Sequence, residues 1–508
     1  MTPLRLTWVQ PEDLLGHELH QAGQDGRDPS AIAARWQSAG GSKPPSRAGA
    51  SDPPTPPYLR ALAQKLLDEL AALPSRLEGK EPTELPRIRS LCPNWPTATD
   101  DSRPATAVPS RSAWAERLGT ADLSRSSGGL GAAPPPSGRG GSGEENPALT
   151  PATLHPRLEA AWLGRAAGCL LGKPVEKLPL AGIRALAQAT GNWPLTTWFT
   201  ERGLPTTLKT THPWNRRSAP TSLAENINGM PEDDDLNYPL LNLLLLQRHG
   251  KHFTTTDVAR LWLDELPAGR TFTAERIAYR NLLDGIEPPH TAHHRNPFRE
   301  WIGALIRADA HGWTNPGAPA AAAEQAHTDA TLTHTANGVY AAMFTAATIA
   351  EAATGTSDIH ACLRTGLTVV PPDSRLARAI RHAIQLAREH RDFDTVVDEL
   401  HTAHATYHWV HAIPNTALLA AALTHADGDF TASICRAVSG GWDTDSNGAT
   451  AGSIAGLLAG SPAALPDRWT APLKNRLATS VADFNGVGFD TLAQLTCDQL
   501  TYNEPALN

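Results

Sequence analysis

Two sets of glycines, each spaced four residues apart, restrict how this chain can fold. The first set is Gly164, Gly168 and Gly172, and the second is Gly448, Gly452 and Gly456. Residues four apart lie on one face of an α-helix, so each set gives its helix a thin face without side chains. Such a face can press closely against a neighbouring helix. We therefore predict two buried helices that pack tightly.

A turn rich in carboxylates precedes the second glycine set. Its sequence is Gly440-Gly441-Trp442-Asp443-Thr444-Asp445-Ser446. Asp443 and Asp445 are each followed by a hydroxyl side chain, and Mg²⁺ and Mn²⁺ prefer such hard oxygen ligands. An acidic cap before a core helix is the alternative interpretation, because Asp and Ser are favoured at that position.

A second acidic cluster, Glu232-Asp233-Asp234-Asp235, stands directly before a strongly apolar run that ends at Leu246. Acidic blocks are usually solvated turns or helix N-termini. Four mutually repelling carboxylates against so apolar a helix are unusual, and a bound cation would offset their repulsion. Two acid-rich turns, each opening a buried helix, are what one divalent site or a two-metal pair requires.

A further carboxylate follows the first glycine set. Lys173-Pro174 is expected to end that helix, because proline cannot continue it. Glu176 then falls on the loop just past the helix end. It is either an ordinary surface glutamate or a carboxylate held over the metal site.

These three segments, in this order, resemble the ADP-ribosylglycohydrolases, all-helical enzymes related to dinitrogenase reductase-activating glycohydrolase. The resemblance spans residues 160 to 460 and implies an all-α, compact multi-helix catalytic domain. It implies a mechanistic role for Glu176 and the ligation of Mg²⁺ or Mn²⁺, as two ions. The implied metal ligands are Asp443, Asp445 and Ser446, with either Asp233 and Asp234 or Asp234 and Asp235, according to the register of the early turn.

The chain departs from the family pattern at three positions. Trp442 intervenes between the glycines and the aspartates of the late signature, and Ser446 replaces its last threonine. Cys169 stands where the first helix of the family often carries an aspartate. These departures mark a divergent branch.

Two more segments resemble family elements that contact the substrate. Asp329 to Gly338 is similar to the central Thr-His stretch, and Trp301 to Asp309 is similar to the segment that holds the ADP-ribose phosphates and distal ribose. An alternative for both is an amphipathic helix, with the histidine satisfied in the core. The substrate-binding residues that the resemblance implies are Gly303, Arg307, His334, Asn337 and Gly338.

The resemblance implies a metal-dependent hydrolase. It would cleave an N- or O-glycosidic bond of an ADP-ribosyl group and release ADP-ribose from a protein side chain or a small molecule. Two alternatives stay open: a ribosyl hydrolase acting on a free nucleotide-linked metabolite, and a catalytically silent ADP-ribose-binding protein. Glu176 and the two acid clusters count against the silent protein, because a binding protein need not keep a general acid or base.

A histidine series competes with this interpretation. His401, His404, His408 and His411 are three or four residues apart, as on one helical face, and helical histidine pairs can bind zinc. No cysteine pair or His-Glu-x-x-His motif accompanies them. We expect this segment to form part of the wall of the cleft instead.

Composition divides the chain into three parts. Residues 1–96 are predicted to be a small helical module of unknown role, with helices over Leu14 to Trp36 and Pro57 to Leu73. Residues 97–150 form a Gly/Pro/Ser-rich linker for which we expect disorder. Residues 151–508 are the expected catalytic domain, rich in helical alanine segments. Because the module is small, we expect it to dock on the catalytic domain or on a partner.

Charge and cysteine content limit the partners and the compartment. A net charge of −8 argues against general nucleic-acid binding, which needs a basic surface. The sequence holds no apolar run of the ~18 residues needed to span a membrane. The five cysteines are scattered, which suits a reducing cytoplasm, and we expect a monomer.

Overall fold

The computed structural model describes residues 6–42, 55–96 and 149–501. In these ranges the chain forms α-helices and short 3₁₀-helices, with three isolated β-bridges in place of any strand. The all-α prediction is therefore confirmed. The predicted linker lies outside the described residues, except for its last two. None of the described helices combines the length and hydropathy that a bilayer-spanning segment needs.

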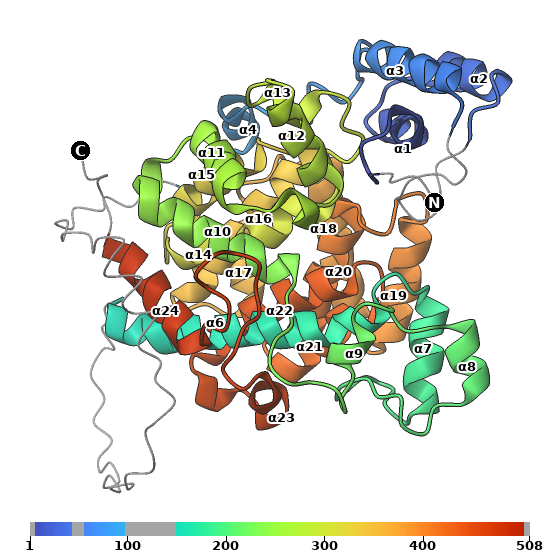
Figure 1. Ribbon diagram of the computed structural model, residues 1–508. Coiled ribbons are helices and arrows are strands. Elements are labelled where there is room, and N and C mark those ends of the chain that lie inside the picture. Colours follow the sequence, from blue (N-terminus) through green and yellow to red (C-terminus); the bar gives the residue numbers. More distant parts are fainter. Residues whose placement is uncertain (1–5, 43–54, 97–148, 502–508) are drawn as a thin grey trace, which may run out of the picture.

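Four of the described helices lie before residue 97. They are α1 (Pro11–Gln24), α2 (Ser30–Ser38), α3 (Pro57–Ala71) and α4 (Leu85–Leu91). The single helix predicted from Leu14 to Trp36 is in fact α1 and α2. The chain turns between them, at Gly26, whose φ of 84° lies in the left-handed region that glycine tolerates. Figure 1 shows α1, α2 and α3 gathered at one edge of the molecule.

The other helices form the large remaining body. The first of them are α6 (Pro151–Gly172), α7 (Leu180–Ala189), α8 (Thr206–Thr211), α9 (Ala219–Ser222), α10 (Asp234–His249), α11 (Thr255–Glu265), α12 (Thr273–Leu283), α13 (His290–His293) and α14 (Asp309–Trp313). They are followed by α15 (Pro319–Ala330), α16 (Ala336–Ala353), α17 (Ile359–Leu367), α18 (Arg375–Glu389), α19 (Phe393–Ala403), α20 (Ala412–Ala426), α21 (Phe430–Ser439), α22 (Thr444–Ala459), α23 (Asp467–Thr470) and α24 (Phe489–Asp498).

The two glycine faces pack against each other. A Cβ atom added at Gly164 would lie 2.1 Å from the carbonyl oxygen of Gly452, and one at Gly168 would lie 1.8 Å from that of Gly448. At Gly172 the added atom would meet the backbone of Thr444 at 2.3 Å. The pairing runs in opposite directions along the two helices, so α6 and α22 are antiparallel. The prediction of tightly packed helices is confirmed.

This antiparallel contact determines where the acidic turn of α22 lies. The C-terminal end of α6 sits beside the N-terminal end of α22, and the Thr444 hydroxyl donates a 2.8 Å hydrogen bond to the carbonyl of Gly172. The start of α10 is tied to the same place by the buried Arg165 of α6, whose Nε donates to the carbonyl of Asp235 at 2.7 Å. Three helix ends therefore converge.

The N-terminal helices pack on this body. Their buried apolar side chains belong to the same continuous hydrophobic core as those of the later helices. Buried ion pairs reinforce the contact: Arg299 pairs with Glu18 at 2.6 Å, and Arg375 pairs with Glu81 at 2.7 Å. Of the two docking partners considered from the sequence, the structure therefore shows the chain's own larger part.

Candidate functional site

A cavity of about 440 Å³ opens where the ends of α6, α10 and α22 meet. One side of it is strongly acidic. The acidic residues on its wall are Glu176, Glu232, Asp233, Asp234, Glu275, Asp443 and Asp445, and Ser446 lies among them. The two acid-rich turns predicted to open buried helices do so, and they face one cavity.

At the start of α10 the aspartates face different ways. Asp233 caps the helix, accepting a 3.0 Å hydrogen bond from the N–H of Asp235. Asp233 and Asp234 line the cavity, whereas Asp235 is not on its wall. Asp235 instead faces α6 and α22, where its carboxylate pairs with Arg165 at 3.4 Å and accepts a 3.3 Å hydrogen bond from the hydroxyl of Ser446.

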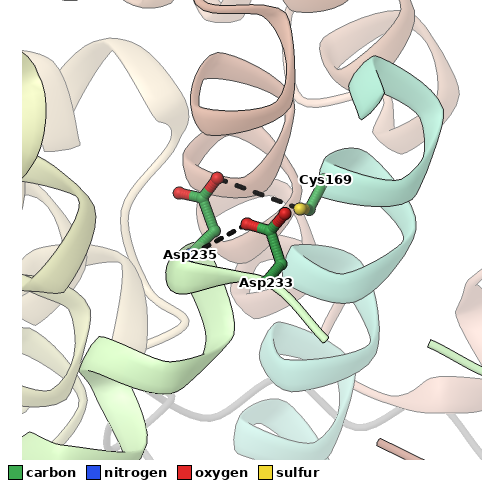
Figure 2. A group of neighbouring side chains, drawn as sticks. All are labelled: Cys169, Asp233 and Asp235. Carbon is green, nitrogen blue, oxygen red and sulfur yellow. Dashed lines mark hydrogen bonds between the residues drawn. The ribbon is translucent and has the colours of Figure 1, made fainter. Parts of the chain in front are cut away.

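Asp235 also belongs to a buried group with Asp233 and Cys169, shown in Figure 2. The Cys169 thiol donates to the Asp235 carboxylate over 3.8 Å. Burial, reinforced by Asp233 and Asp235, raises the pKa of the Cys169 thiol well above its ordinary value. A thiol so held is protonated and unsuited to nucleophilic attack. Cys169 therefore serves as a packed hydrogen-bond donor behind the acidic wall.

The acidic turn before α22 is held by backbone contacts. Gly441 and Trp442 both have positive φ, 80° and 57°, which turns the chain sharply into the helix. The Trp442 ring stacks on His401 with centroids 4.1 Å apart. The N–H of Asp443 then donates to the Asn415 side chain at 3.1 Å, which fixes the turn beside α20.

Glu176 lies on the loop predicted for it, directly after the 3₁₀-helix Lys173–Val175. Its carboxylate accepts a 2.6 Å hydrogen bond from the amide of Asn215 and pairs with Lys177 at 2.6 Å. Oxygen atoms of Glu176, Asp443 and Asp445 lie within 4.8 Å of one another. The half-buried loop carboxylate thus faces the late aspartates across the cavity.

The site carries more negative charge than its lysines offset. Burial and the neighbouring aspartates raise the pKa of Asp234 and of Asp443 well above the usual range. Burial, with Glu176 and Asp233 nearby, raises the pKa of Asp445 to about 7. Burial would raise the pKa of Asp233 too, but the ammonium of Lys173 holds it below its ordinary value.

These residues suit a hard divalent cation. Three buried aspartates (Asp233, Asp443 and Asp445), the half-buried Asp234 and the hydroxyl of Ser446 supply oxygen donors of the type that Mg²⁺ and Mn²⁺ select. Burial and mutual repulsion raise the pKa of these carboxyl groups, and a bound cation would offset both effects.

The substrate-binding residues predicted from the sequence are not all on this wall. Gly303 lines the cavity, close to Glu275. Arg307 is fully buried beneath it, where its guanidinium pairs with Asp329 at 2.8 Å and with Glu275 at 3.3 Å.

His334, Asn337 and Gly338 are also buried away from the wall. The imidazole Nε2 of His334 is 4.0 Å from the carboxylate of Glu275. The ring therefore lies beside a residue of the cavity wall without lining the cavity itself. Asn337 donates to Glu300 at 2.8 Å, and Gly338 packs against the backbone of Arg299.

The histidine series does not lie on one helical face, so that expectation is wrong. Helix α19 ends at Ala403 and α20 begins at Ala412, so the series crosses a turn. His401 bonds to the carbonyl of Gly440 at 2.8 Å, and His411 caps α20. Among the described residues, the groups able to hold a metal contain none of these histidines.

Several cavity residues escaped sequence reasoning. The sequence pattern assigns Lys173 only to the end of a helix. Its position between Gly172 and Glu176, however, is consistent with a place on the cavity wall. Glu275 and Trp8 carry no motif, and only the tertiary fold brings them to the wall. Trp8 in particular comes from the N-terminal part, outside the segments that resemble the family.

Known proteins resemble this chain over its larger, C-terminal part. The sequence model of the ADP-ribosylglycohydrolase family matches residues 150–500. A search of curated proteins found no match. Among solved structures, an ADP-ribosylglycohydrolase-related protein complex shares 20% identity, and the match covers 69% of this chain and 98% of that chain with a TM-score of 0.43. Because the family model spans more than half of the chain, including both acidic turns, this chain belongs to the ADP-ribosylglycohydrolase family.

Proposed function

We propose that the chain is a divalent-cation-dependent hydrolase that cleaves the glycosidic bond of an ADP-ribosyl group, releasing ADP-ribose from a protein side chain or a small molecule. The observation that carries this proposal is the convergence of both acidic turns and Glu176 on one cavity within the matched residues. A binding protein would have no need of a carboxylate positioned at the mouth of a metal site.

Asp233, Asp234, Asp443, Asp445 and Ser446 are the residues that would hold Mg²⁺ or Mn²⁺. When bound, a divalent cation orients ribose hydroxyls and lowers the pKa of a water molecule. Asp235 has a different role in this proposal. It takes the hydroxyl hydrogen of Ser446, which leaves the lone pairs of that oxygen free to face the cation.

Glu176 is the proposed general acid and base. Hydrolysis adds the hydroxide of water to the anomeric carbon and gives the proton to the leaving group. The Glu176 carboxylate accepts the proton of the attacking water and returns it to the departing atom. Asn215 positions it by donating to one carboxylate oxygen, and the other oxygen pairs with Lys177.

Turnover of three substrate classes tests the proposal. ADP-ribosyl-arginine peptide, ADP-ribosyl-serine peptide and a free ADP-ribosyl metabolite are each incubated with full-length protein, with Mg²⁺ or after EDTA treatment. We expect Mg²⁺-dependent release of ADP-ribose from at least one class. Release from the free metabolite alone would favour a small-molecule hydrolase. Binding of ADP-ribose without any turnover would overturn the hydrolase in favour of a silent binding protein.

A further inference from the structure

The wall of the cavity carries aromatic side chains as well as carboxylates. Four rings line it: Trp8, Phe272, Trp301 and Trp409. Three of them come from the matched part of the chain, but Trp8 precedes α1 and lies outside the matched residues 150–500. A side chain from the N-terminal part thus forms part of the cavity wall.

The segment around Trp8 is anchored to the cavity by hydrogen bonds on both sides of that residue. Arg276 of α12 donates to the Thr7 hydroxyl at 3.0 Å, and Arg280 donates to the Val9 carbonyl at 3.5 Å. The Trp8 ring meets Phe298 edge to face, with centroids 5.9 Å apart. These contacts hold the indole in one place.

The backbone of Trp8 supports the same conclusion. Its φ of 69° lies in the left-handed region, which costs free energy for a bulky residue and persists only where the surroundings enforce it. The hydrogen bonds to Thr7 and Val9 and the ring contact with Phe298 offset that cost.

We propose that Trp8 is a substrate-binding residue, and that the N-terminal segment completes the active site by stacking its indole on a planar aromatic ring of the ligand. This inference rests on the proposed function and adds to it the recognition of a ring remote from the glycosidic bond. The composition of the cavity wall supports it, because the carboxylates suit a cation and ribose hydroxyls, whereas the aromatic rings suit a flat heterocycle.

Binding measurements on the full-length protein test this inference. Calorimetric affinities are compared for ADP-ribose, which carries an aromatic base, and for ribose 5-phosphate, which lacks one. Because stacking of a base on an aromatic side chain is worth roughly tenfold to a hundredfold in affinity, we expect Trp8→Ala to weaken ADP-ribose by that factor. Ribose 5-phosphate affinity should be unchanged, and Trp8→Phe should restore most of the loss.

The matched control is Leu6→Ala, two residues away and 60% exposed, which should leave both affinities as they are. Thermal unfolding of each variant checks that the fold is kept. In turnover, Trp8→Ala should raise KM with little change in kcat, because the ring is far from the reacting bond.

Each other outcome counts against one proposal or both. Unchanged ADP-ribose affinity in Trp8→Ala, or equal losses for both ligands, would overturn the stacking role and leave the proposed function standing. Failure of the wild-type protein to bind ADP-ribose at all would overturn the proposed function and this inference together.

Discussion

The ammonium of Lys173 contacts the carboxylate of Asp233, at the place where the end of α6 meets the start of α10. A protein cation thus already neutralises one of the carboxylates that would face a metal ion. Lys173 is buried, and burial and Asp233 act on it in opposite directions, with the net result that its pKa is raised well above the ordinary value. It therefore stays charged and would compete with the proposed cation for Asp233.

Replacing Lys173 should reveal this competition. In Lys173→Met, Asp233 loses its partner, so the metal-free protein should unfold at a lower temperature. Divalent cations should then bind more tightly, by roughly tenfold, because one positive charge has left the site. Titration calorimetry and Mg²⁺-induced shifts in Tm measure both effects. Lys173→Arg, which keeps the charge, is the control, and weaker metal binding in Lys173→Met would show that the lysine assists the cation.

Removing either late aspartate should abolish metal binding. Asp443→Ala and Asp445→Ala each take an oxygen donor from the turn before α22, while the hydrogen bond from the Asp443 N–H to the Asn415 side chain remains. Metal analysis and calorimetry should show loss of bound Mg²⁺ or Mn²⁺ with an unchanged circular dichroism spectrum. Asp264→Ala, on the exposed face of α11, is the control. Wild-type affinity in either cavity variant would remove that residue from the ligand set.

Glu176→Gln should separate chemistry from binding. The amide keeps the size of the side chain and can still accept from Asn215, but it loses the ion pair with Lys177 and cannot take up a proton. Loss of a general acid or base costs roughly 10²- to 10⁴-fold in rate, so kcat should fall by that factor while metal affinity holds. Asn215→Ala should cost less, because it only frees Glu176 to rotate. A change confined to KM would assign Glu176 to substrate binding alone.

A single methyl group added where the glycine faces of α6 and α22 are in contact should destabilise the folded protein. In Gly168→Ala the added carbon would overlap the carbonyl oxygen of Gly448, and backbone cannot yield as a flexible side chain can. We expect a loss of about 1–3 kcal/mol or more in unfolding free energy, measured by denaturant titration. Gly269→Ala, where nothing lies within 4 Å of the added atom, should change stability by less than about 0.5 kcal/mol. Equal effects of the two substitutions would contradict the close contact.

The buried pair between Glu81 and Arg375 should hold the N-terminal part in place. Glu81 accepts from Arg375 and from Asn337, so Glu81→Gln leaves a buried guanidinium with only Glu300 as a charged partner. Breaking such a pair typically costs about 3–5 kcal/mol, and the remaining partner should reduce this loss. Limited proteolysis and thermal unfolding should both register it. Unchanged protease resistance would show that the apolar contacts suffice for docking.

Local sequence patterns predicted much of this molecule. The glycine spacing indicated close helix packing, and the acidic turns before α10 and α22 were identified as helix starts, because these signals depend on neighbours in the chain. Which face each aspartate takes was not predictable. Asp234 and Asp235 are adjacent and chemically identical, and only tertiary contacts distinguish them, because Asp235 contacts Arg165, Ser446 and Cys169.

Signals that depend on distant parts of the chain were missed or misread. The histidine series fitted a helical period, but the chain leaves the helix after Ala403, and no local pattern marked that end clearly. Trp8 reaches the cavity because α12 supplies Arg276 and Arg280 to hold it. A contact across more than two hundred residues leaves no trace in local periodicity.

The close backbone contact between α6 and α22 has a consequence for which metal ion the proposed site would accept. The backbones of the two helices are in direct contact there. The helices can therefore slide past each other only in steps of about one turn, roughly 5.4 Å, if the glycines are to stay paired. Because Arg165 of α6 also holds the start of α10, the spacing between the aspartates of α10 and those before α22 inherits that stiffness. Mg²⁺ needs oxygen atoms at about 2.0–2.1 Å and Ca²⁺ at about 2.3–2.6 Å. Six glycines that contact no ligand atom would thereby determine which ionic radius the site accepts.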